Sequence, residues 1–566
     1  MTDSPADTGP ADAELRRIYT EEWEWRTVEL GGQSWRSTVP DPSLPDIGPA
    51  AQQRRLERWQ ATLAEVEAID PDALSEPERT NREVYRDQLR TLIDQQRFRT
   101  FEAPANADTS FWNTLIERGR RPITDLDHGR RWLSQLRHIS DHLAQQLENM
   151  RAGLRRGFGP PKITMIGREA TARTVADASD PAALSFVQAL DGLPAGPEAT
   201  ALRDEAVIVV RDQVQPAFRT LLAFLTEEYL PNLPEAIAAV DLAGRDFYLA
   251  QLREFTTLEL TPEEIHAIGL REVDLLRTEM RAIAEETGFD GDVDALLAFM
   301  RTDPQFYVDT PRALMLEATW QAKKFDAVVH RYFGRVPRQR FGIVEVSPDL
   351  APFYTFGRGS VDTYFLNTYG LQDRPLFSLP ALTLHEAAPG HAFQIPLALE
   401  QTQHPEFRRS TYISAYGEGW ALYTERLGVE MGTYETPYEL MGMLCYQMWR
   451  AVRLVIDPGL HALGWSRERA QAFLRDNTAI GEHEVVTEVD RYIAWPGQAC
   501  AYYLGELEIL ELRARAEKEL GTAFDLRHFH DQVLSLGSVP LRVLRTEIDR
   551  FIARGGTSPY VDDPVR

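Results

Sequence analysis

Apolar and charged residues alternate at helical spacing along most of the chain. From Leu15 to about Glu102, Leu, Ile, Tyr and Trp recur every three or four residues, and a second such block runs from about Ile123 to Arg156. This period places the apolar side chains on one face of a helix. The same pattern resumes near Leu379 and continues to the end of the chain. The sequence therefore predicts a mainly α-helical protein.

Three helix starts can be located from their capping residues. A Ser or Thr side chain accepts a hydrogen bond from the first turn, and proline fits the first helical position. A Glu three residues after the cap completes a capping box. We therefore expect helices to begin at Ser75-Glu76-Pro77-Glu78, at Thr261-Pro262-Glu263-Glu264 and at Thr310-Pro311.

One stretch breaks the helical pattern. Residues 341–346 (FGIVEV), 354–356 and 360–367 are rich in Tyr, Phe, Val and Thr, which favour strands. A small β-sheet is therefore expected just before the helix that begins near Leu379. Gly357-Arg358-Gly359-Ser360 is expected to form a turn between strands. Residues 361–367 could present an edge to which an extended peptide adds as a further strand, with Asn367 either contacting substrate or completing a turn.

The composition is that of a protein able to bury a large core. Of 566 residues, 43% are hydrophobic and 26% charged. Residues 1–14 are polar and are expected to be disordered. Residues 15–245 are expected to form a helical N-terminal part. Residues 246–566 are expected to form a catalytic part that shares one fold unit with it.

The charge balance argues against two classes of partner. With 61 Lys and Arg against 86 Asp and Glu, the formal net charge is −25, so phosphate backbones and anionic lipids are repelled. Cys445 and Cys500 are the only cysteines, which excludes a disulfide scaffold. The start of the chain does not read as a signal peptide, and no apolar run approaches the roughly 20 residues of a membrane span. We expect a cytoplasmic protein that binds neither nucleic acid nor membrane.

The motif with the clearest chemistry is HEAAPGH, residues 385–391. Zinc peptidases usually carry H-E-x-x-H, because residues four apart lie about 40° apart around a helix. Here the histidines are six apart, a rotation of about 240°, so a regular helix could not aim both at one ion. Pro389 lacks an N–H for the carbonyl of His385, and Gly390 tolerates unusual backbone angles. We therefore expect the helix to break at Pro389-Gly390 and bring His391 back towards His385.

A carboxylate from a separate helix would complete the metal site. Glu418 lies 27 residues after His391, inside a segment rich in glycine and aromatic residues. Two imidazoles and one carboxylate with an open fourth position suit catalytic zinc, although iron or manganese would accept the same ligands. Glu386 would be the general base. Glu425, seven positions after Glu418, projects from nearly the same helix face and could orient a ligand.

Four ordered motifs resemble the bacterial family called domain of unknown function 885. They are residues 385–394 (HEAAPGHAFQ), 418–425 (EGWALYTE), 453–465 (RLVIDPGLHALGW) and 496–505 (PGQACAYYLG). That family is similar to the gluzincin zinc metallopeptidases, whose helical bodies enclose a deep substrate channel. The resemblance implies zinc bound by His385, His391 and Glu418, with Glu386 as the catalytic base. Family members often carry a second histidine directly after the one matching His391. Here that residue is Ala392, which points to His391 as the ligand.

Amide hydrolysis also needs a hydrogen-bond donor for the oxyanion. The candidates are His461, Tyr492, Tyr502 and Tyr503, of which His461 and Tyr503 are preferred. Arg453 could bind a substrate carboxylate bidentately, or pair with Asp457 four residues later in its own helix. Gln498 could hold a substrate amide or cap a helix.

The predicted function is zinc-dependent hydrolysis of short peptides or related amides, because a closed helical channel would exclude folded chains. Two alternatives stay open at this point. The same site could act on a non-peptide amide or ester, or the chain could be a non-catalytic helical binding module. Loss of activity and stability on chelation would distinguish an enzyme from such a module.

Overall fold

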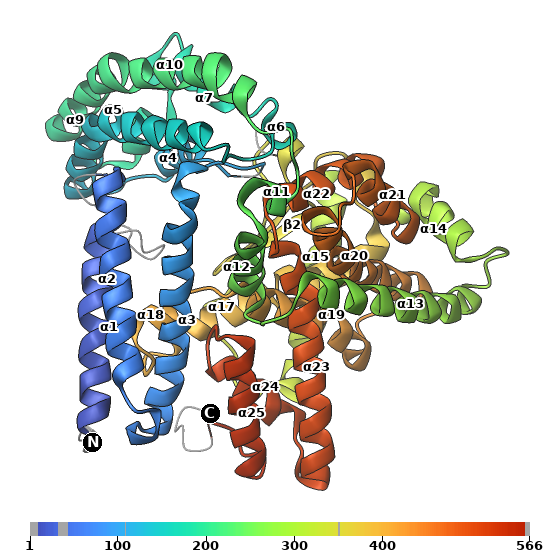
Figure 1. Ribbon diagram of the computed structural model, residues 1–566. Coiled ribbons are helices and arrows are strands. Elements are labelled where there is room, and N and C mark those ends of the chain that lie inside the picture. Colours follow the sequence, from blue (N-terminus) through green and yellow to red (C-terminus); the bar gives the residue numbers. More distant parts are fainter. Residues whose placement is uncertain (1–8, 32–43, 108, 349–350, 561–566) are drawn as a thin grey trace. The chain divides into compact units, whose positions relative to one another are not determined.

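The computed structural model describes residues 9–31, 44–107, 109–348 and 351–560. These residues form a mainly helical protein with one small three-stranded sheet, as the sequence predicts (Figure 1). Contacts within the chain group into two units, residues up to 247 with 493–495, and residues 248–492 with 496–566. The functional division into an N-terminal and a catalytic part stays a prediction. Of the helices described, none has the length and apolar character needed to cross a bilayer.

The first unit is built from helices. Its long helices α1, α2 and α3 lie side by side (Figure 1), joined by the buried carboxylate of Glu22. That carboxylate accepts hydrogen bonds from Arg26, Trp59 and Tyr85. The helices are α1 (Pro10–Glu29), α2 (Pro49–Ala68), α3 (Glu76–Phe98), α4 (Phe111–Gly119), α5 (Leu126–Arg155), α6 (Lys162–Met165), α7 (Ala170–Ala176), α8 (Ser185–Gln188), α9 (Pro197–Val209), α10 (Gln215–Ala223) and α11 (Ala239–Ala243).

The N-terminus differs from the prediction of a disordered segment over residues 1–14. Residues 1–8 lie outside the described residues, but α1 already begins at Pro10. Proline suits the first position of a helix, and the Asp12 carboxylate accepts the backbone N–H of Ser75 at 2.9 Å. This contact ties the first turn of α1 to the start of α3. The contact between Asp12 and Ser75 could not be predicted from the composition of residues 1–14.

The predicted helix starts are confirmed at α3, α13 (Pro262–Thr287) and α15 (Pro311–Tyr332). Thr261 forms the full capping box with Glu264. Thr310 accepts a hydrogen bond from Ala313 N at 3.2 Å. Ser75 precedes α3 but makes no side-chain cap.

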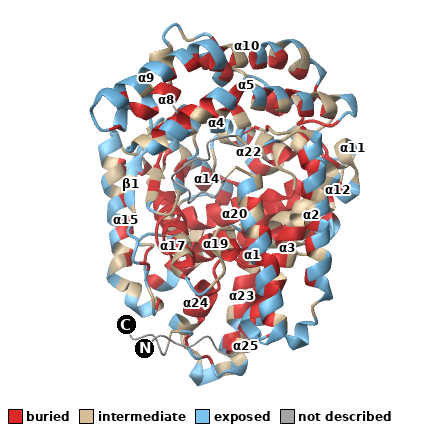
Figure 2. Cartoon of the chain, turned by 90° about the vertical axis from the view of Figure 1, so that its left-hand side faces the viewer, coloured by how far each residue is buried: buried red, intermediate tan, exposed pale blue. Residues whose placement is uncertain are grey.

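The second unit contains the metal-site motifs and the sheet. Its helices α17, α19 and α20 are largely buried (Figure 2), which explains why their sequences are not clearly two-faced. The remaining helices are α12 (Arg245–Thr256), α14 (Val293–Thr302), α16 (Leu379–Glu386), α17 (His391–Glu400), α18 (Glu406–Arg409), α19 (Ser414–Met431), α20 (Pro437–His461), α21 (Arg467–Asn477), α22 (Glu482–Ala494), α23 (Ala501–Leu520), α24 (Leu526–Ser535) and α25 (Leu541–Ala553).

The sheet precedes α16, as predicted, but its strands differ in detail. Strands β1 (Gly342–Glu345), β2 (Gly357–Gly359) and β3 (Thr363–Leu366) follow the order β1-β3-β2. β3 pairs with β1 in parallel and with β2 antiparallel. The predicted peptide-binding edge at residues 361–367 is therefore wrong, because β3 is paired on both sides. The outer strands are β1 and β2.

β2 occupies the segment expected to be a turn, while the expected strand at 354–356 is irregular. Glycine is a poor strand former, so propensity gives no hint of β2. The strand passes so close to α16 that larger residues do not fit: a Cβ on Gly359 would lie 2.1 Å from the carbonyl oxygen of Glu386. Glycine in a strand marks such a close approach.

Helices α19 and α23 meet through glycines. A Cβ on Gly419 would lie 2.5 Å from the Cα of Gly505, and one on Gly505 would lie 2.0 Å from the carbonyl oxygen of Ala415. Backbone atoms cannot yield as a flexible side chain can. The two glycines therefore set the separation of the two helices.

Gly505→Ala is expected to destabilise the protein by roughly 1–3 kcal/mol, because the added methyl group forces α19 and α23 apart. Urea unfolding followed by circular dichroism measures the change. The matched control is Gly342→Ala in β1, where a Cβ meets no atom within 4 Å. Equal stability of the two variants would contradict this packing.

Candidate metal centre

The break between α16 and α17 brings the two histidines together. α16 ends at Glu386 and α17 begins at His391, so the predicted interruption is confirmed. The N–H of Gly390 donates to the carbonyl of Leu384 at 2.9 Å. A Cβ on Gly390 would lie only 1.8 Å from the carbonyl oxygen of His385. The chain can fold back this tightly only because residue 390 is glycine.

Helix α19 fastens both ends of this break. The indole N–H of Trp420 donates to the carbonyl of Pro389 at 2.8 Å. The hydroxyl of Thr424 donates to the carbonyl of Leu384 at 3.1 Å. These bonds reach carbonyls on both sides of the break, and they fix α19 against the two histidines.

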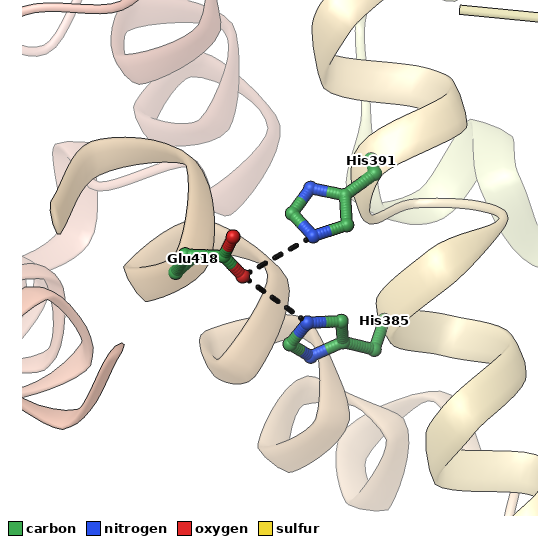
Figure 3. Close-up of side chains that lie close together, drawn as sticks. All are labelled: His385, His391 and Glu418. Carbon is green, nitrogen blue, oxygen red and sulfur yellow. Dashed lines mark ion pairs between the residues drawn. The ribbon is translucent and has the colours of Figure 1, made fainter. Parts of the chain in front are cut away.

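Glu418 on α19 points between the two imidazole rings (Figure 3). Its Oε2 lies 3.5 Å from His385 Nε2 and 3.3 Å from His391 Nε2. One ligand atom from each of the three residues lies within 4.8 Å of the other two. A tetrahedral zinc ion, with bonds of about 2.0–2.1 Å, keeps its ligand atoms about 3.4 Å apart. The two distances from Glu418 to the histidines are therefore close to the ligand spacing around a small metal ion.

Neighbouring side chains hold His385 and Glu418 in place. His385 Nδ1 lies 2.7 Å from Oε1 of the buried Glu425, which favours the tautomer that leaves Nε2 free to bind a metal. Tyr412 donates to Glu418 Oε1 at 3.0 Å, and its side chain is 45% exposed. The buried Nδ1 of His391 has no hydrogen-bond partner among the described residues.

The electrostatics of the site favour an added positive charge. Burial alone would lower the pKa of His385, but the carboxylates of Glu418 and Glu425 outweigh it and raise that pKa to about 10. Burial likewise tends to raise the pKa of Glu418, yet His391 and His385 hold it well below its usual value. A positive charge next to Glu418 and Glu425 therefore stabilises the cluster. A divalent ion would supply the same compensation.

Glu386 lies beside the cluster and is held by β2. In the antiparallel pair of β2 and β3, Ser360 N donates to Thr363 O, so the N–H of the preceding residue, Gly359, points away from β3. That N–H donates to Glu386 Oε2 at 2.5 Å. One carboxylate oxygen is thereby fixed, which sets the direction of the other.

The two preferred oxyanion donors have other neighbours. His461 is buried, its Nε2 lies 2.9 Å from the carbonyl of Tyr492, and burial lowers its pKa to about 4. The Tyr503 hydroxyl donates to Glu272 at 3.4 Å. Instead, the ring of Tyr502 lies parallel to the His385 ring, with centroids 6.4 Å apart. A role for His461 and Tyr503 stays a prediction.

Two of the predicted substrate-binding residues, Asn367 and Gln498, make hydrogen bonds within the protein. Asn367 uses its side chain within a turn, donating to Ala351 O and Tyr354 O and accepting from Tyr369 N. Gln498 accepts a hydrogen bond from Arg491 at 3.1 Å.

Arg453 does not pair with Asp457. Its Nη2 lies 2.9 Å from Glu488 on α22, whereas Asp457 accepts hydrogen bonds from Tyr248 and Gly497. The long arginine side chain reaches a neighbouring helix, so the helical i, i+4 spacing does not choose its partner.

Sequence reasoning missed the residues that support the centre: Gly359, Tyr412, Trp420 and Thr424. Trp420 and Thr424 stood inside the motif at 418–425, and their spacing of one helical turn could have signalled a shared face. Gly359 gave only the weaker signal of paired glycines within a β-rich stretch.

Two solved structures resemble this chain. One is a candidate lipoprotein from Colwellia psychrerythraea, with 25% identity and a TM-score of 0.86, covering 96% of this chain and 99% of that one. The other is a candidate lipoprotein of unknown function from Shewanella oneidensis, with 17% identity and a TM-score of 0.67, covering 94% and 99%. These descriptions contradict the predicted cytoplasmic location, which is therefore corrected.

No curated protein matches the chain in sequence. A family model does match, over residues 27–548, and its description is "Bacterial protein of unknown function (DUF885)". This match spans the broken helix, Glu418 and the sheet. The chain belongs to the DUF885 family.

Proposed function

We propose that the protein is a zinc-dependent hydrolase of short peptides or related amides. The observation that carries this proposal is the position of Glu418 Oε2, which lies 3.5 Å from His385 Nε2 and 3.3 Å from His391 Nε2, with Glu386 next to His385 in the chain. Two imidazoles and one carboxylate are the ligand set of a catalytic zinc site with an open fourth position. The contact of His385 Nδ1 with Glu425 is the second hydrogen bond that metal-ligating histidines usually make.

Zinc held by these residues would lower the pKa of a water molecule to about 7 and polarise the substrate carbonyl. Glu386 would take a proton from the attacking water and return it to the departing amine. The Gly359 N–H holds one oxygen of Glu386 in place, and the other oxygen would take the proton. Glu425 would keep His385 in the metal-binding tautomer.

Glu386→Gln is expected to reduce peptide hydrolysis by about 10²- to 10⁴-fold, because glutamine cannot accept the proton. Its zinc content should match that of the wild type, since Glu386 is not a ligand. Turnover of a peptide library by mass spectrometry, with metal analysis of the same sample, measures both. Glu285→Gln on the exposed face of α13 is the control. Full activity of Glu386→Gln would refute the assigned base.

His391→Ala is expected to lose most of the bound zinc, because only two ligands remain. For the wild type, zinc at roughly 100 times its Kd should raise the free energy of unfolding by about 2.7 kcal/mol, and the variant should gain far less. Metal analysis and thermal unfolding with and without zinc measure this. The exposed His483 offers the control His483→Ala. Unchanged zinc stoichiometry in His391→Ala would move the site elsewhere.

A further inference from the structure

A cluster of arginine and aromatic side chains lies next to the metal centre. Arg450 and Arg453 are both buried and stand three residues apart on α20. We call them the arginine pair. The Arg453 guanidinium stacks on Trp449, Tyr492 and Tyr502, at 5.0, 5.5 and 4.6 Å from the ring centroids. Arg450 stacks on Tyr446 and Trp449 at 4.7 and 4.9 Å. These rings hold the faces of the guanidinium groups and leave their N–H edges for other partners.

Part of these N–H edges has no partner. Arg453 donates from Nε to Tyr492 and from Nη2 to Glu488. Its Nη1 and the Nε of Arg450 are buried without a hydrogen-bond acceptor in the described part of the chain. An unsatisfied buried donor on a charged group is costly, so native structures seldom retain one without a ligand or water.

Two contacts connect the arginine pair to the metal centre. The ring of Tyr502 stacks on the imidazole of His385, and the Arg453 guanidinium stacks on the same tyrosine ring. Glu425 contacts His385 at 2.7 Å and Arg450 at 3.9 Å. Each arginine is thus separated from the metal ligand His385 by a single side chain. An anion bound there would lie within a short peptide's reach of the reacting carbonyl.

We propose that Arg450 and Arg453 bind the free C-terminal carboxylate of the substrate, so that the protein acts on peptides with an unblocked C-terminus. This inference rests on the proposed function. A carboxylate fits the few available N–H groups, and guanidinium binds it with directed, charge-assisted hydrogen bonds. The C-terminal carboxylate is the anion that every unblocked short peptide carries, whatever its sequence.

Binding to the zinc-loaded, full-length Glu386→Gln variant tests the inference without consuming the ligand. Calorimetry compares three probes: Ala-Ala-Ala, its C-terminal amide, and the amide of Ala-Ala-Glu, which carries its carboxylate on a side chain. Ala-Ala-Ala is expected to bind roughly 10- to 100-fold more tightly than its amide, the effect of losing charge-assisted hydrogen bonds. Adding Arg453→Gln should abolish this preference. Adding Arg467→Gln, which breaks an arginine–carboxylate pair with Asp490, should retain it.

If Arg453→Gln fails to fold, the comparison of the three probes on the Glu386→Gln variant with both arginines intact still tests the inference. Equal affinity for Ala-Ala-Ala and its amide, or no affinity for either, overturns the carboxylate site. Equal affinity for Ala-Ala-Ala and the Ala-Ala-Glu amide overturns the assignment to the C-terminus. Cleavage of Ala-Ala-Ala by the protein with Glu386 intact is measured separately. If the protein prefers Ala-Ala-Ala to its amide but cleaves neither, the hydrolase proposal is refuted and the carboxylate site is supported.

Discussion

The fold-back of the chain between α16 and α17 is the constraint on which the centre depends. Two histidines six residues apart cannot share an ion on a regular helix, and the break makes the spacing usable. The break leaves carbonyls without helical partners in a buried region, where unpaired polar groups are costly. Trp420 and Thr424 donate hydrogen bonds to carbonyls on both sides of the break. The helix that contributes Glu418 therefore also stabilises the backbone that positions both histidines.

The electrostatics follow from this geometry. Glu418 and Glu425 approach the imidazoles from one helix, seven residues apart and so on nearly the same face. Two buried carboxylates beside two rings leave a deficit of positive charge, and a proton or a metal ion can make it up. The arginine pair contacts this centre through Tyr502 and Glu425. In the proposed reaction, the metal ion would bind the substrate at the reacting carbonyl and the arginine pair would bind its C-terminal carboxylate.

Glycine contributes to the centre by allowing backbones to approach. Gly390 permits the fold-back, Gly359 lets β2 pass along Glu386, and Gly419 and Gly505 bring α23 against α19. The last contact is what carries Tyr502 on α23 towards His385. None of these glycines touches a substrate or a metal in the proposed reaction, yet each sets a distance within the centre.

The sequence by itself determined the helical class, three helix starts, the break at Pro389-Gly390 and the nomination of His385, His391 and Glu418. These rest on local rules: helical period, capping, the missing N–H of proline and the rotation per residue. Only the tertiary structure decided that Gly357–Gly359 is a strand, that Arg453 pairs with Glu488, and that Tyr502 rather than Tyr503 stacks on His385. Neighbours from distant segments choose among such options. Two adjacent tyrosines have the same composition and propensity, and only the packing of α23 on α19 distinguishes them.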